Sequence, residues 1–155
     1  MNELQALATI GGSLALIGGL AGSAIGIGLA ATAGVATLSE DSGQLRNVVV
    51  LASLPMTQTF YGLIILIIIL TVVMPNLATS GSSGLAIAAI GTMGGAAELF
   101  SAIFQGSVCA SGIALLPKTK GQILTSSMML AVFVELIGVL GLVFVIMAFS
   151  ILKLM

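Results

Sequence analysis

The chain has 155 residues, of which 59% are hydrophobic and only 6% are charged, and its net charge is −1. Soluble domains carry about 25% charged residues, so this composition excludes a soluble globular protein and indicates an integral membrane protein. One cysteine excludes an internal disulfide, and because no cluster of basic residues occurs we expect no nucleic-acid partner.

Three polar stretches, at 39–47, 75–84 and 117–122, divide the chain into four apolar segments. The segments predict helices over residues 4–38, 45–75, 83–116 and 122–153. Each is longer than the roughly 20 residues that cross a hydrocarbon core, so the helices must tilt or protrude. The predicted fold is therefore an all-α membrane protein made of two helical hairpins.

Positive charges predict the orientation in the membrane. Arg46, Lys118 and Lys120 lie at the first–second and third–fourth turns, whereas the middle loop has no charge. The positive-inside rule places these two turns in the cytoplasm and both termini outside, although Lys153 near the C-terminus disagrees. We expect a multi-pass protein of the cell membrane.

The two halves of the sequence repeat. An offset of 78 residues (101 − 23) places Ser-Ala-Ile at 23–25 on the same tripeptide at 101–103. The same offset places Thr57 on Glu135, so the first half has a hydroxyl where the second has a carboxylate. The predicted repeats are residues 1–77 and 78–155, with the carboxylate in the second.

Small residues recur at a spacing of four in the first and third segments, a pattern that lets helix backbones approach closely in lipid. The first row is Gly18, Gly22, Gly26, Ala30 and Gly34, and the second is Gly94, Ala102, Gly106, Ala110 and Ala114. We expect the first and third helices to pack tightly inside and the second and fourth to face outward, as in a ring. A generic Gly-rich bundle is the alternative.

The fourth segment carries one carboxylate, Glu135, in the apolar run AVFVELIGVLGL. A charge at the bilayer centre costs about 2.5–3.5 kcal/mol on insertion scales, and such residues usually lie on an ion or proton path. Glu135 is therefore the first candidate for a functional group.

The second segment offers further polar groups on one helical face. Leu54, Thr57, Gln58 and Tyr61 are spaced i, i+3, i+4 and i+7. Pro55 has no N–H, so the helix is expected to kink there.

Counting from the cytoplasmic turns places Thr57, Gln105 and Glu135 at a similar depth. One carboxylate with several neutral oxygens suits a small hard cation stripped of water, whereas a proton needs only the carboxylate. The pattern favours Na⁺, with Li⁺ or H⁺ as substitutes. The alternative is that these groups only form hydrogen bonds between helices.

These residues resemble a known family. LPMTQTFYG at 54–62, Phe100-Ser101 with Gln105-Gly106, and Val134-Glu135 are similar to the proteolipid, or rotor-ring, subunit of V-type ATPases in its Na⁺-translocating bacterial form. The resemblance covers nearly the whole chain. It implies a Na⁺ site made by the Leu54 carbonyl, Thr57, Gln58, Gln105 and Glu135, with Tyr61 bonded to the carboxylate.

The resemblance also implies partners: identical copies in a ring, a static membrane subunit bearing an arginine, a central-stalk subunit at the cytoplasmic turns, and lipid. Partner subunits would couple the turning ring to ATP hydrolysis or synthesis. The chain has no GxxxxGK[ST] loop, so we expect a non-catalytic subunit that translocates ions.

Two other classes of protein fit the sequence less well. A four-helix proton-coupled antiporter would have its acid early in the chain and aromatic residues around a pocket, but Trp is absent. A structural or pore-forming protein would not need Glu135 beside a Thr-Gln-Gln set. Glu98, two turns before Gln105, departs from the family pattern, and we expect it to be neutral and hydrogen-bonded.

Overall fold

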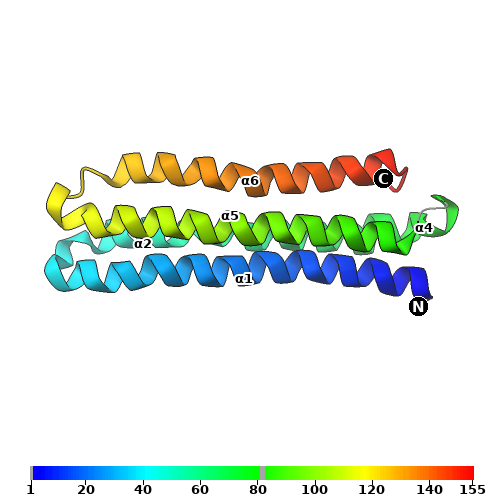
Figure 1. The fold of residues 1–155 in the computed structure, drawn as a ribbon, viewed down its shortest axis with the longest axis horizontal. Helices are drawn as coiled ribbons and strands as arrows, with labels where there is room; N and C mark the ends of the chain where they lie inside the picture. Colours follow the sequence, from blue (N-terminus) through cyan, green and yellow to red (C-terminus); the bar gives the residue numbers. More distant parts are fainter. Residues whose placement is uncertain (1, 81–82) are drawn as a thin grey trace.

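The computed structural model describes residues 2–80 and 83–155, which form four long antiparallel rods of helix (Figure 1). Each rod is long and apolar enough to cross a membrane. They comprise α1 (Glu3–Glu40), a composite second rod (Ser42–Leu77), α5 (Gly84–Thr119) and α6 (Leu124–Ile151). The predicted all-helical fold is confirmed, with boundaries within a few residues. The predicted loop at 75–84 includes residues 81 and 82, which lie outside the described part.

The second rod changes its helical winding twice. Its parts are η1 (Ser42–Gln44), α2 (Leu45–Ser53), the 3₁₀ turn η2 (Leu54–Met56), α3 (Thr57–Ile68), the π-helical turn η3 (Ile69–Val73) and α4 (Met74–Ser80). Pro55 accounts for η2, since it cannot donate to the carbonyl of Leu51. In the structure the Leu54 N–H donates to that carbonyl instead. The Leu51 carbonyl therefore keeps a hydrogen-bond donor, in a tighter 3₁₀ turn.

Local caps fix where the rods begin and end. Asn2 and Gln5 form a capping box at the start of α1, with bonds of 2.9 and 3.1 Å. Ser83 caps α5 by accepting from the N–H of Leu85. At the other end of α5 the chain turns through left-handed φ at Lys120 (51°) and Gly121 (82°). Both termini lie at the end of the bundle opposite the α1–α2 and α5–α6 turns (Figure 1).

Helices α1 and α5 touch backbone to backbone, as the small-residue rows predicted. A Cβ on Gly22 would lie 2.7 Å from the carbonyl oxygen of Leu99. Gly18 lies directly on the backbone of Gly95, and Gly26 on that of Gly106. No larger residue fits at these positions, so glycine is what allows the contact.

The α5 row does not face α1 along its whole length. A Cβ on Gly94 would meet Ile65 of α3 at 2.8 Å and Val145 of α6 at 2.9 Å. Gly91 and Gly95 take the α1-facing positions instead, against the backbones of Gly11 and Leu14. Thus α5 lies between α1 on one side and α3 and α6 on the other, and it needs small residues on both faces.

The core consists of two apolar clusters separated along the bundle. One, toward the termini, is centred on Ile65, Ile69, Ile87, Val145 and Phe149. The other, toward the turns, is centred on Leu51, Cys109, Ile113, Leu116 and Ala131. The buried polar side chains Gln58, Glu98, Ser101 and Gln105 occupy the layer between the clusters. We call this the polar layer.

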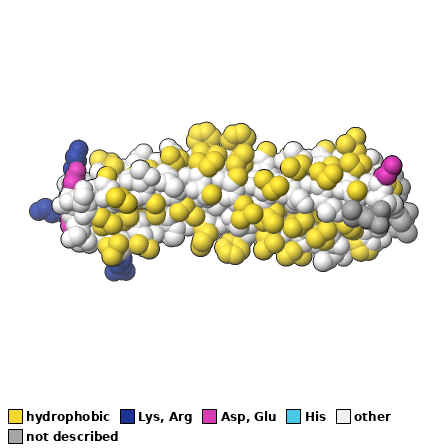
Figure 2. Space-filling view, turned by 90° about the horizontal axis from the view of Figure 1, so that it is seen from below, with side chains coloured by type: hydrophobic (Ala, Val, Ile, Leu, Met, Phe, Trp, Pro, Cys, Tyr) yellow, Lys and Arg dark blue, Asp and Glu magenta, His cyan; other side chains and the backbone are white. Residues whose placement is uncertain are grey.

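The outer surface matches a membrane environment. Figure 2 shows hydrophobic side chains along the length of the face in view, and charged ones gathered at its two ends. Glu40, Asp41, Arg46, Lys118 and Lys120 lie at or beside the two turns, whereas Glu3 lies near the N-terminus. The charges therefore leave a long apolar band between them.

Candidate functional site

The polar layer is connected across the helices by hydrogen bonds of glutamine side chains. The Nε2 group of Gln58, on α3, donates to Oε1 of Gln105, on α5, at 2.9 Å. It also donates to Oγ of Ser101, one turn away on α5, at 3.0 Å. Both glutamines are fully buried. Because both N–H groups of Gln58 are used in this way, its Oε1 is turned away from α5.

The Glu135 carboxylate, on α6, accepts one hydrogen bond from each of two neighbouring helices. Gln105 Nε2 donates to Oε2 at 3.2 Å, and the Tyr61 hydroxyl donates to Oε1 at 3.2 Å. Glu135 and Tyr61 are half-buried, in contrast to the glutamines behind them. The carboxylate therefore lies at the edge of the polar layer, where α3 and α6 meet the lateral surface.

The 3₁₀ turn before α3 brings two more oxygens to this edge. The Thr57 hydroxyl lies 3.2 Å from Oε1 of Gln58 and 3.4 Å from the carbonyl oxygen of Leu54. The backbone N–H of Thr57 also donates to the Leu54 carbonyl, which closes the turn. Thus the LP-x-TQ motif gathers a carbonyl, a hydroxyl and an amide oxygen within one turn of chain.

All six residues singled out from the sequence thus belong to one hydrogen-bonded network. It runs from Leu54 through Thr57, Gln58 and Gln105 to Glu135 and Tyr61. The network supplies oxygen atoms and one carboxylate, with no thiol or imidazole. Such a donor set is suited to hard cations and to protons.

Ser101 joins this network, although the sequence pattern gave it no role in the site. Its hydroxyl donates to the backbone carbonyl of Val134 at 3.0 Å and accepts from Gln58 at 3.0 Å. It therefore ties α6, beside Glu135, to α3 and α5. Its position four residues before Gln105, on the same helical face, is the signal that could have found it.

The matching serine of the first repeat has no such partner. Ser23 is buried, yet its Oγ accepts and donates no hydrogen bond in the structure. The repeat also places Ile27 at the Gln105 position and Thr57 at the Glu135 position. The polar layer therefore takes Glu98, Ser101 and Gln105 from the second repeat and Gln58, on α3, from the first.

Glu98 lies in the polar layer but outside the network. Its side chain is 0% exposed, and neither carboxyl oxygen has a hydrogen-bond partner. The expected hydrogen bond is therefore absent. The carboxyl group lies against Gly138 of α6, where a Cβ would come within 2.7 Å of Oε2 and 3.1 Å of the Ser101 hydroxyl.

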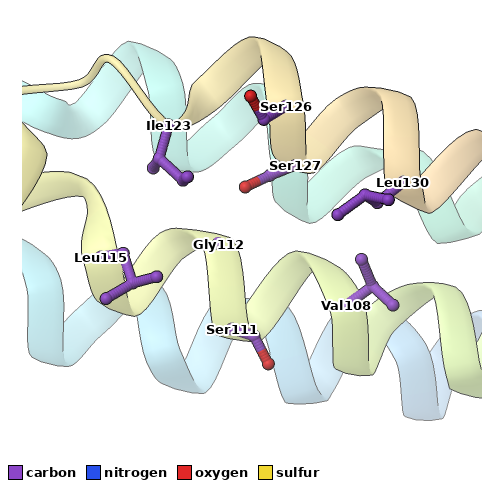
Figure 3. A pocket seen from close by; sticks show the side chains of 8 residues that line it. All are labelled: Val108, Ser111, Gly112, Leu115, Ile123, Ser126, Ser127 and Leu130. Carbon is purple, nitrogen blue, oxygen red and sulfur yellow. The ribbon is translucent and has the colours of Figure 1, made fainter.

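A pocket of about 230 Å³ opens between α5 and α6, nearer the turns than the polar layer. Figure 3 shows Ile123, Leu130 and Val108 around it, with Ser127 directed across it toward α5. Its lining contains no carboxylate and is mostly apolar, so it is distinct from the Glu135 network.

Comparison with known proteins gives the family. The profile of the family described as the C subunit of ATP synthase matches the chain twice, over residues 10–69 and 84–148. These matches cover the two helical hairpins. A curated relative, the A-type ATP synthase subunit K of Methanocaldococcus jannaschii, is 35% identical over 139 residues. That alignment covers 89% of this chain and 61% of the relative, so the chain spans about three fifths of the relative's length. This four-helix membrane protein, with its duplicated hairpin, therefore belongs to the ATP synthase C-subunit family.

Proposed function

We propose that the chain is a rotor-ring subunit of a V/A-type rotary ATPase, and that Glu135 carries one Na⁺ per subunit across the membrane as the ring turns. The observation that carries the proposal is the Glu135 carboxylate, hydrogen-bonded at the edge of a polar layer between two apolar clusters. Membership of the ATP synthase C-subunit family and likeness to a subunit K support the rotor role.

The ligands proposed for Na⁺ are the Leu54 carbonyl, the Thr57 hydroxyl, the amide oxygens of Gln58 and Gln105, and the Glu135 carboxylate. One carboxylate balances one monovalent charge, and the neutral oxygens replace the water that the ion loses. In the structure, Gln105 turns its NH₂ toward the carboxylate. To offer Oε1 to the cation it must therefore turn its amide over, which releases the bond from Gln58.

The choice of Na⁺ over H⁺ rests on the number of oxygens. A proton at Glu135 would need no Leu54 carbonyl and no Thr57 hydroxyl, yet the Thr57 hydroxyl lies beside both the Leu54 carbonyl and Oε1 of Gln58. Li⁺, which takes the same ligand type, is expected to substitute for Na⁺. A ring of the same kind that carries H⁺ is the second candidate, because Gln105 and Tyr61 stabilise the carboxylate without a metal.

The proposed setting rests on membership of the C-subunit family and on the positions of the basic residues. Identical copies form the ring, and an arginine-bearing static subunit exchanges the ion at the exposed edge of the site. The two turns, which carry Arg46, Lys118 and Lys120, lie in the cytoplasm against a central stalk, and both termini lie outside. Partner subunits bind the nucleotide.

Carbodiimide labelling of the assembled ring tests the proposal. The reagent should modify Glu135, and Na⁺ should slow the modification more strongly as the pH rises, because protons then compete less for the carboxylate. Li⁺ should protect and K⁺ should not. Equal protection by K⁺, or no protection by any cation, would refute the Na⁺ site while leaving the rotor role standing.

Two variants separate ligands from packing residues. Thr57→Ala and Gln105→Ala should raise the Na⁺ concentration that gives half-protection, yet leave a ring that migrates as a large oligomer without boiling. Ser111→Ala is the matched control, since Ser111 is exposed on α5 and bonds only within its own helix. Loss of the ring in both site variants would instead assign Thr57 and Gln105 a packing role.

A further inference from the structure

Glu98 is a second carboxyl group of the membrane interior that the proposed transport does not use. Its side chain is fully buried inside a single subunit. Neither oxygen meets a hydrogen-bond donor. An ionised carboxylate buried in this position, with no hydrogen-bond donor from the protein, would be strongly destabilised by the loss of its hydration.

No basic side chain can supply the missing counter-charge. Within the described helices, α1, α3 and α6 contain no Lys or Arg, and α5 carries only Lys118, in its last turn. The other titratable groups on these helices are acids or weak acids and not cations: Glu3 and Glu40 at the two ends of α1, Tyr61 of α3, Cys109 of α5 and Glu135 of α6. Full burial within the subunit also prevents an arginine of another protein from reaching the carboxyl group.

The surroundings hold too few oxygens for a metal ion. Ser101 Oγ borders the same space over Gly138, but it already donates to the carbonyl of Val134 and accepts from Gln58. Among the described residues, no group of three His, Cys, Asp or Glu side chains comes together. Hard cations need about six oxygen ligands, so a proton is the cation that fits.

Two glycines of α6 make the space that the carboxyl group fills. A Cβ at Gly138 would lie 2.7 Å from Oε2 of Glu98, and a Cβ at Gly141 would lie 3.6 Å from Oε1. The carboxyl group is therefore seated in a recess of α6, one turn from Glu135 toward the terminal end. The space that these two glycines leave is filled by the carboxyl group itself.

We propose that Glu98 is a resident proton site: a carboxylic acid that keeps its proton while Glu135 exchanges its ion. Each subunit then contains two membrane carboxyls but carries one ion per turn. Glu98 acts by filling the recess beside Ser101 and Gln58, and its neutrality keeps a second negative charge away from the Glu135 site. The inference rests on the proposed function only in naming Glu135 as the exchanging group.

Infrared spectroscopy of the purified ring tests the proposal, and a Glu135→Gln background makes the test independent of the transported ion. With isotope-labelled glutamate, the labelled carboxyls are then those of Glu3, Glu40 and Glu98. Glu3 and Glu40 are exposed, and Glu98→Gln leaves both of them in place. One label-shifted, protonated C=O band per subunit should persist at neutral and mildly alkaline pH, and Glu98→Gln should remove it.

The outcomes are distinguishable without relying on a single variant. Two results overturn the proposal even if Glu98→Gln fails to assemble. One is absence of the band in the labelled Glu135→Gln ring, and the other is disappearance of the band before the pH has been raised to neutral. In a ring with Glu135 intact, Glu98→Gln should leave the half-protecting Na⁺ concentration unchanged. A large rise in that concentration would make Glu98 part of the ion site and would equally overturn the proposal. K⁺ protection of Glu135, in contrast, would count only against the Na⁺ site.

Discussion

Replacing Ser101 with alanine removes the hydroxyl that joins three helices behind the proposed ion site. The wild-type side chain accepts from Gln58 at 3.0 Å and donates to the carbonyl of Val134 at 3.0 Å. Without it, one N–H of Gln58 loses its partner, and the amide is free to turn its oxygen away from Thr57. Cation affinity should therefore fall, although no proposed ligand has been removed.

The size of the effect follows from the one hydrogen bond that Gln58 loses when the Ser101 hydroxyl is removed. Hydrogen bonds between membrane helices contribute about 0.6 kcal/mol on average and about 1.7 kcal/mol at most. With about 1.4 kcal/mol for each tenfold change in affinity, the loss corresponds to roughly a 3- to 15-fold weaker cation affinity. Ser101→Ala should therefore raise the half-protecting Na⁺ concentration in the carbodiimide assay by about that factor.

Ser111→Ala serves as the control, because its hydroxyl donates to the Ser107 carbonyl of its own helix. It should leave both the half-protecting concentration and the ring unchanged. Wild-type Na⁺ protection in Ser101→Ala would show that the Gln58 orientation does not depend on Ser101. Weaker protection that accompanies loss of the ring would show that Ser101 is needed for assembly, and the positioning argument would then fail.

Two further predictions concern the carboxylate and the helix contact. Tyr61→Phe removes the donor to Oε1 of Glu135 and should speed carbodiimide labelling at low Na⁺, whereas an unchanged labelling rate would mean that the 3.2 Å bond does not restrain the carboxylate. Gly18→Ala places a methyl group on the backbone of Gly95 and should destabilise the subunit by about 1–3 kcal/mol or more, measured as earlier unfolding in detergent titrations. Gly28→Ala is its control, because a Cβ there meets nothing within 4 Å and should be neutral or stabilising, and equal stability of the two variants would contradict the close-packing argument.

The fold could be predicted largely because its signals are local. The lengths of the apolar segments predicted the ends of the four rods to within a few residues, and the charged turns indicated where each hairpin reverses direction. The contact between α1 and α5 followed from the glycine rows, since only small residues allow backbones to meet. Which α5 glycine faces which helix did not follow. Gly94 packs against α3 and α6, and that choice depends on the rotation of α5 within the bundle.

The site was predictable where its members share one helical face and one depth. Gln105 bonds to Glu135, and Gln58 and Thr57 are connected to it through Gln105, because helix rise converts residue number into depth. The direction of each amide could not be predicted, because it depends on which N–H groups find acceptors across helices. Ser101 supplies one of those acceptors.

The environment of Glu98 was also beyond the sequence. Whether a carboxyl group on α5 finds a hydrogen-bond donor depends on the residues of α6 that lie opposite it. Gly138 and Gly141 leave space for the Glu98 carboxyl group but offer it no donor. Both glycines lie in the apolar run around Glu135, but that run does not show that they face Glu98. The packing of α5 against α6 was needed to connect them with that residue.

For the proposed ion site, the two apolar clusters determine the route by which an ion can enter and leave. Aliphatic and aromatic side chains, such as Ile65 and Phe149 on one side and Leu51 and Leu116 on the other, block travel parallel to the helices. Glu135 is reachable only sideways, through the flank where it is half-buried. An isolated subunit therefore offers no continuous passage, and leakage is prevented by geometry: an ion can complete the crossing only if the loaded flank is physically carried from one access point to another.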